Sequence, residues 1–365
     1  MKWWCIFEEI IVIDCDVHND WLTAEVLLPY IDPNFRDYVV RGERPGPRGA
    51  FPHANRPWLH PENPMRTGLT GDGHPGAHFD IMKEALLDAY SYDFAILTGE
   101  QGIEVSTLGN PHYASALAKA HNDWLLDTWL IGDARLRGSL LVAPQDPDGA
   151  AAEIRRIGQQ EEFVQILVSS GSHRPYGDPF YHPIWAAAVE VGLPVAIHLG
   201  GHGGRNYNPI GCGPTTFFWE THALLCETGM AHLASLIAHG VFETWPTLKV
   251  LLVETGVAWV GPILWRLDAD YKALHRETPW LKRLPSEYFR DHIRLATQPL
   301  EQPPNQEHLW AVLEAIDGER TLMFASGYPH WNFTAPDSLN IPGEWRERIF
   351  DTNAREFYTR LPQND

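Results

Sequence analysis

A carboxylate and an imidazole close the first apolar run of the chain, at Asp16 and His18. The run over 10–13 is β-branched and does not alternate, which predicts a strand that is covered on both faces. Residues two apart on a strand point the same way, so Asp16 and His18 are expected to share a face at its end. The pair can form half of a metal site. The alternative is a capping aspartate followed by a surface histidine.

The remaining chain alternates between short apolar runs and stretches with helical spacing. This alternation predicts a parallel sheet, and eight units in one chain favour a closed (β/α)8 barrel, a TIM barrel, over an open doubly wound sheet. We interpret 1–365 as a single domain. Its segment 20–78 is rich in Pro, Gly and His and is expected to form a lid-like insertion after the first strand. The expected strands are 10–13, 94–98, 136–142, 163–168, 195–198, 248–254, 293–297 and 322–325.

Polar side chains stand where several of these apolar runs stop. A barrel places its chemistry at the carboxyl-terminal ends of the strands, which converge on one mouth. Contact with water explains any single polar strand end, but it explains poorly the recurrence of histidine and carboxylate on the first, fifth and sixth strands. The candidates after the first strand are Ser170, His198, Glu254, Gln298 and His330, with Trp331 next to the last of them.

Composition limits the partners that this chain can have. Its 28 basic and 47 acidic residues give a net charge of −19, which argues against nucleic acid and anionic membranes. Four cysteines without CxxC spacing are read as reduced thiols, and the start of the chain matches neither a signal peptide nor a membrane span. We therefore expect a cytoplasmic protein that acts on a small molecule.

Five segments together resemble the amidohydrolase superfamily, in the branch of aminocarboxymuconate-semialdehyde decarboxylase and γ-resorcylate decarboxylase. The resemblance covers the chain from about Ile10 to Tyr358. The segments that carry it are IDCDVH (13–18), PVAIH (194–198), GVFETWPTLKV (240–250), ASGYPHW (325–331) and NAREFY (353–358).

The resemblance implies one divalent metal, with zinc expected first and manganese second, and often a homodimer. Asp16, His18 and His198 match the family's metal ligands. Where many members carry a histidine that activates the metal-bound water, this chain has Glu254. The family's metal-binding aspartate on the eighth strand is replaced by Gly327, which has no side chain. This glycine is compatible with a rewired site, with an inactive relative, or with a substitution introduced to trap a ligand.

These residues predict a metal-dependent hydrolase of a small, aromatic carboxylate or carbonyl compound. Glu254 is the candidate base for the metal-bound water, and His198 takes part through the metal. Hydrolysis is preferred over decarboxylation because Gly327 removes the carboxylate that a decarboxylase of this family would use. Non-oxidative decarboxylation and a binding protein without turnover are the alternatives. The candidate substrate-binding residues are Ser170, Gln298, His330 and Trp331.

Overall fold

The computed structural model describes residues 11–41, 75–202, 211, 213 and 215–362, and within these ranges eight parallel strands form one sheet in chain order. Each strand pairs with the next along the sequence. The predicted parallel sheet is therefore confirmed. The strands are β1 (Ile13–Val17), β2 (Phe94–Leu97), β3 (Leu136–Leu141), β4 (Phe163–Ser169), β5 (Val195–His198), β6 (Val250–Val253), β7 (Ile293–Ala296) and β8 (Leu322–Met323).

The first and last strands meet and close the sheet into a barrel. Cys15 N donates to Phe324 O (2.9 Å), and Val17 pairs with Tyr328 as a parallel bridge. Just beyond β1, His18 N donates to Tyr328 O (2.8 Å). The segment after β8 is thereby held beside Asp16 and His18. The TIM barrel expected from the sequence is confirmed.

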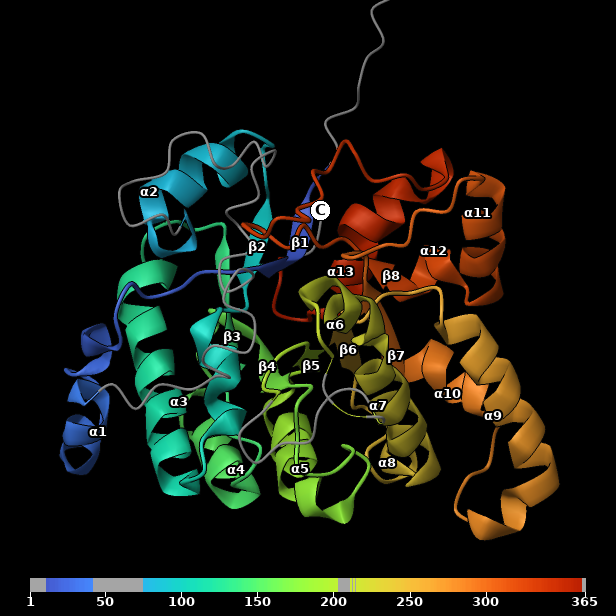
Figure 1. The fold of residues 1–365 in the computed structure, drawn as a ribbon, viewed down its shortest axis with the longest axis horizontal. Coiled ribbons are helices and arrows are strands. Elements are labelled where there is room, and N and C mark those ends of the chain that lie inside the picture. The colour runs from blue at the N-terminus through green and yellow to red at the C-terminus, as the bar shows by residue number, and fades with distance from the viewer. Residues whose placement is uncertain (1–10, 42–74, 203–210, 212, 214, 363–365) are drawn as a thin grey trace, which may run out of the picture.

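Helices lie around the outside of the strands (Figure 1). The α-helices are α1 (Arg36–Val40), α2 (Phe79–Met82), α3 (Pro111–Leu125), α4 (Pro147–Ile157), α5 (His182–Val191), α6 (Phe218–Leu224), α7 (Cys226–Ala238), α8 (Val241–Thr244), α9 (Val260–Leu274), α10 (Pro285–His292), α11 (Gln306–Ala315), α12 (Gly318–Thr321) and α13 (Asn353–Phe357). The shorter 3-10 and π segments are η1 (Ala24–Leu27), η2 (Pro33–Phe35), η5 (Pro75–Ala77), η6 (Lys83–Asp88), η7 (Gln101–Thr107), η8 (Leu126–Leu130), η9 (Pro179–Tyr181), η10 (His275–Glu277), η11 (Gly343–Trp345) and η12 (Arg348–Thr352).

One buried amide ties a helix to the barrel wall. On α3, Asn122 receives Leu141 N at Oδ1 and donates Nδ2 to Leu141 O, each at 2.9 Å. The same Nδ2 donates to the carboxylate of Glu153 on α4 (2.9 Å). Asn122 is fully buried, so these bonds fix α3, β3 and α4 relative to one another.

The first strand begins later than the sequence predicted. It runs over Ile13–Val17 and not over 10–13, so Asp14 and Asp16 lie inside it. The buried Asp14 is tolerated here because partners satisfy both of its oxygens: Tyr92 Oη donates to Asp14 Oδ2 (3.0 Å), and Ser326 N donates to Asp14 Oδ1 (3.0 Å). Burial raises the pKa of Asp14 to about 7.

The expected insertion over 20–78 falls mostly outside the described residues, which leave out 42–74. Its described beginning contains η1, η2 and α1, and its end contains η5. The lid therefore stays a prediction. Within the described part of the chain, no helix combines the length and the apolar composition that a bilayer crossing needs.

Candidate metal centre

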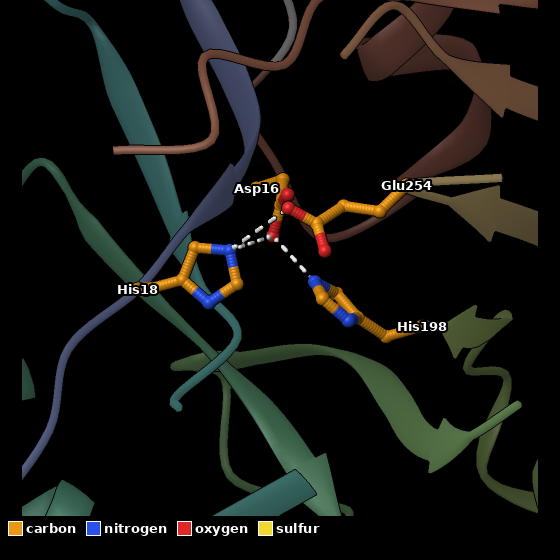
Figure 2. A group of neighbouring side chains, drawn as sticks. All are labelled: Asp16, His18, His198 and Glu254. Atoms are coloured by element: carbon orange, nitrogen blue, oxygen red, sulfur yellow. Dashed lines mark hydrogen bonds and ion pairs between the residues drawn. The ribbon is translucent and has the colours of Figure 1, made fainter. Parts of the chain in front are cut away.

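Four side chains converge at the carboxyl-terminal mouth of the barrel (Figure 2). Asp16 comes from β1, His18 follows β1, His198 ends β5 and Glu254 follows β6. His198 Nε2 lies 3.1 Å from Asp16 Oδ1, and His18 Nε2 lies 3.5 Å from the same oxygen. His18 Nε2 also lies 3.7 Å from Glu254 Oε1. We call Asp16, His18, His198 and Glu254 the four-residue cluster.

Backbone carbonyls orient both histidines of the cluster. His18 Nδ1 donates to Gly99 O (2.7 Å), and His198 Nδ1 donates to Leu199 O (2.6 Å). A carbonyl only accepts, so each Nδ1 carries the proton and each Nε2 is turned toward Asp16. This is how metal-binding histidines are usually held, with one nitrogen anchored and the other presented to the ion.

The cluster fits a divalent metal. One ligand atom from each of its four residues lies within 4.8 Å of the others. Asp16 Oδ2 and His18 Nε2 are buried and have no hydrogen-bond partner in the described structure, which is costly unless a cation meets them. Two carboxylates and two imidazoles are a donor set that suits manganese as well as zinc.

The charges of the cluster hold Asp16 ionised. Burial alone would raise the pKa of this carboxyl, but His18 and His198 hold it well below its usual range. Burial lowers the pKa of His18, and Asp16 and Glu254 outweigh that effect and raise it well above the ordinary value. In the metal-free protein the attraction between these groups therefore holds the cluster together.

Glu254 does not have the raised pKa that the sequence suggested for a base. Burial would raise its pKa, but His330 and His18 lower it far below the ordinary value. His330 Nδ1 lies 3.1 Å from Glu254 Oε1. The residue also has a left-handed backbone, with φ of 60°. Glu254 is thus held as a carboxylate in the metal-free protein, and its role as the base stays a prediction.

His330 bridges two carboxylates. Its Nδ1 faces Glu254 and its Nε2 lies 2.9 Å from Glu100 Oε2. Burial and the neighbouring His18 lower its pKa, but Glu100 and Glu254 outweigh them and raise it to about 9. The ring also lies over His18, with centroids 4.0 Å apart. His330 is therefore a protonated histidine at the edge of the four-residue cluster.

Glu100 is a site residue that the sequence analysis missed. It stands three residues after the end of β2, at the same carboxyl-terminal end of the barrel as the candidates considered on other strands. The apolar run over 94–97 followed by Thr98 would have marked this strand end. Thr98 itself donates to Asp16 Oδ1 (2.7 Å), so the second strand supports the cluster twice.

Gly327 and Gln298 lie against each other beside β1. Gly327 has a φ of +63°, and a Cβ atom there would lie 2.6 Å from Gln298 Cδ. Gln298 is fully buried, and its Nε2 donates to Asn332 O (3.3 Å). The space that a side chain at 327 would occupy therefore contains a carboxamide.

The side chains of the other two expected substrate-binding residues contact histidines outside the cluster, although Ser170 N donates to His198 O (2.6 Å). Ser170 is buried, and its Oγ lies 3.2 Å from His202 Nε2. Burial lowers the pKa of His202 to about 4, so this pair is neutral. Trp331 is 38% exposed and stands edge-on to His222, with ring centroids 5.4 Å apart. Of the four expected residues, Trp331 is the one that presents an open aromatic surface.

Comparison with known proteins places the whole barrel in one family. The profile described as Amidohydrolase matches residues 13–360. A γ-resorcylate decarboxylase of Rhodococcus jostii is 27% identical in an alignment 321 positions long, which covers 78% of this chain and 92% of that protein.

Solved structures share the fold at lower identity. The 5-carboxyvanillate decarboxylase of Novosphingobium aromaticivorans, with bound manganese, has a TM-score of 0.69 at 23% identity, covering 96% of this chain and 98% of that one. A dihydroxybenzoic acid decarboxylase of Polaromonas, with manganese and the inhibitor 2-nitroresorcinol, has a TM-score of 0.67 at 20% identity, covering 96% and 97%. Because the profile spans the barrel from β1 to beyond α13, this chain is an enzyme of the amidohydrolase family.

Proposed function

We propose that this protein is a divalent-metal-dependent decarboxylase that removes the carboxylate of a small aromatic acid. The observation that carries the proposal is the four-residue cluster with a protonated His330 beside it. Relatives named as decarboxylases of γ-resorcylate, 5-carboxyvanillate and dihydroxybenzoate support the reaction class. The hydrolase favoured by the sequence is replaced by its decarboxylase alternative.

Manganese is the metal that the comparisons support. Two related structures contain it, and nothing comparable supports zinc, which the sequence ranked first. Asp16, His18, His198 and Glu254 would hold the ion. When bound, the metal supplies positive charge that attracts and orients the anionic oxygens of the substrate.

Decarboxylation needs a proton for the ring carbon. When the bond between the ring and the carboxylate breaks, CO₂ leaves and the electron pair stays on the ring carbon, which must then be protonated. His330 holds protons on both ring nitrogens, because both face carboxylate oxygens. It stands next to His18 and Glu254, so it is the proton donor that we assign.

The state of Glu254 argues against hydrolysis. A hydrolase needs a base to take a proton from water, and a base works best with a pKa near the working pH. The pKa of Glu254 lies far below that range because His330 and His18 surround it. In the decarboxylase its negative charge instead keeps His330 protonated and helps to hold the metal.

We expect the aromatic ring of the substrate to pack against the indole of Trp331. Its exposed indole is carried by the segment after His330, and His222 supports its edge. Ser170 and Gln298 are buried and already engaged in contacts with the protein, so the roles expected for them in substrate binding stay predictions.

The proposal is tested by turnover of defined acids. Metal-free protein is loaded with one equivalent of Mn²⁺ and mixed with 2,6-dihydroxybenzoate, 2-hydroxybenzoate or 5-carboxyvanillate. We expect release of CO₂ and appearance of the matching phenol, measured by gas analysis and chromatography. The Asp16→Asn variant should release none.

Two outcomes would contradict the proposal. Hydrolysis of aromatic esters or amides by the manganese-loaded protein, without decarboxylation of any acid, would show that the protein is a hydrolase. If the folded protein binds manganese and transforms none of these compounds, the alternative of a binding protein without turnover would be favoured.

A further inference from the structure

The side chain of Gln298 fills the space in front of Gly327. A Cβ atom on residue 327 would lie 2.6 Å from Gln298 Cδ, 2.9 Å from Nε2 and 3.0 Å from Oε1. Real Cβ atoms essentially never come within 3.0 Å of such an atom. A side chain at 327 and the present position of the carboxamide therefore exclude each other.

A hydrogen bond fixes which way the carboxamide is turned. Gln298 Nε2 donates to the backbone oxygen of Asn332 (3.3 Å), so the NH₂ group points toward that carbonyl. Gln298 Oε1 is then left buried, with no hydrogen-bond partner in the described part of the chain. A buried acceptor without a partner costs about 1–3 kcal/mol. A cation next to this oxygen would remove that cost.

The carboxamide lies beside the residues of the cluster. Gly327 N donates to Asp16 O (3.2 Å), and the neighbouring Tyr328 pairs with Val17. The group in front of Gly327 thus belongs to the same end of the barrel as Asp16 and His18. Unpartnered buried atoms gather at this end: Asp16 Oδ2, His18 Nε2 and Gln298 Oε1.

We propose that the carboxamide oxygen of Gln298 is a further oxygen donor of the metal centre, at the position left free by Gly327. An amide oxygen is a hard ligand of the kind that manganese, magnesium and calcium accept. With Asp16, Glu254 and two histidines it makes an oxygen-rich donor set, which favours manganese. The inference deepens the proposed function, since it concerns the same metal site.

Binding of Mn²⁺ to metal-free protein tests this assignment without any turnover. Free Mn²⁺ is followed by electron paramagnetic resonance during a titration, and the Kd is fitted. Gln298→Leu keeps the volume and removes the oxygen, so we expect the Kd to rise about tenfold or more. Gln298→Glu keeps an oxygen donor and should bind Mn²⁺ at least as tightly as the natural chain.

Gln145 offers a matched control. It follows β3, donates Nε2 to Val105 O (2.8 Å) and Leu108 O (3.2 Å), and also leaves its Oε1 buried without a partner. Its carboxamide is held by the carbonyls of Val105 and Leu108, whereas that of Gln298 lies against Gly327, next to Asp16. Gln145→Leu should therefore leave the Kd for Mn²⁺ unchanged.

Gly327→Ala probes the same contact from the other side. The added methyl group displaces the carboxamide, so this variant should also weaken Mn²⁺ binding. In the Gln298→Leu background the same change should have no further effect, because the oxygen is already gone. Circular dichroism and urea unfolding check the fold of each variant. If Gln298→Leu does not fold, Gly327→Ala compared with Gln298→Glu decides the question.

A Kd for Gln298→Leu within about twofold of the natural chain would overturn the inference, whatever the turnover. Absence of CO₂ release from the manganese-loaded natural protein would instead contradict the proposed function and leave this assignment standing. The two failures are thus read from different measurements.

Discussion

At the scale of single residues, the site depends on charged groups that shift the pKa values of one another. His330 is buried, which disfavours its charged form, but Glu100 and Glu254 raise its pKa to about 9. Glu254 is buried too, and His330 and His18 keep it ionised. Neither residue would have its protonation state without the other. The proton donor and the carboxylate that we assign are therefore one functional pair.

Replacing His330 by glutamine should abolish most of the turnover. The NH₂ group of the amide can still donate to a neighbouring carboxylate, but the amide has no acidic proton to give, so we expect kcat to fall by about two orders of magnitude or more. Mn²⁺ affinity should change little if the ion lies in the four-residue cluster, whereas a large loss would point to the second potential metal group, His18, Glu100 and His330. Single-turnover kinetics would measure the rate, and a variant with near-normal kcat would remove His330 from the role of acid.

The pH dependence of kcat follows from the same residue. A group with a raised pKa keeps its proton below that pKa and loses it as the pH rises. The pKa of His330 is about 9 without metal, and the charge of a bound ion shifts it downward. We expect kcat to be highest at lower pH and to fall on an alkaline limb at or below about 9. A rate that increases through this range would contradict the assignment.

At the scale of elements, each ligand owes its place to the end of a strand. β1 delivers Asp16, β5 delivers His198 and the residue after β6 is Glu254. The strands are held from outside, and α3 is the clearest case, because Asn122 satisfies the backbone of Leu141 and the carboxylate of Glu153. The buried amide thus adds a side-chain connection to the two ladders that hold β3 in the wall.

Asn122→Leu should destabilise the fold more than its volume change suggests. The variant removes the bonds of Asn122 to the N–H and C=O of Leu141 and one of the two donors to Glu153 Oε1, so we expect a loss of about 2–4 kcal/mol in unfolding free energy. Urea unfolding measures it. Asn110→Ala, which removes only the cap at the start of α3, is the control and should cost about 1 kcal/mol.

Strand ends explain why much of the site could be predicted from sequence. Asp16, His18 and His198 each follow or end an apolar run, and local period and order are enough to bring them to one mouth. The first strand was misplaced by three residues, because Asp14 and Asp16 look unfit for a core. Their partners, such as Tyr92 and Ser326, are distant in sequence.

Contacts between loops could not be predicted. The low pKa of Glu254 depends on His330, which is 76 residues away, and the place of Gln298 depends on the conformation of Gly327. The hydrophobic periodicity of the sequence does not predict such contacts, because they depend on the conformation of loops, which differs from one barrel to another. The sequence could therefore name the candidate ligands and His330, but not the contacts between His330, Glu100 and Glu254 that set their charges.

At the scale of the whole molecule, the metal is expected to couple the ends of the strands. Asp16 and His198 come from β1 and β5, separated by 182 residues, and Glu254 follows β6. An ion bound by Asp16, His198 and Glu254 would connect β1 to β5 and β6, which lie far from it in the sequence. The homodimer expected from the resemblance stays a prediction, and the structure describes one chain.

Manganese should stabilise the entire barrel. Ligand binding to the folded state adds about 2.7 kcal/mol when the free ion is at 100 times its Kd, which corresponds to a rise of a few degrees in Tm. Differential scanning calorimetry with Mn²⁺ and with EDTA would measure the shift. Asp16→Asn should lose it, whereas an equal shift in that variant would place the ion elsewhere.

The contact between Gly327 and Gln298 also sets the order in which this site could change during evolution. An aspartate arriving at 327 would meet the carboxamide and a backbone with φ of +63°, so it would be harmful while Gln298 stays. A smaller residue at 298 would have to come first, and that step would cost the oxygen donor that we assign. Both single steps carry a cost, so residues 327 and 298 are expected to change together and not one at a time.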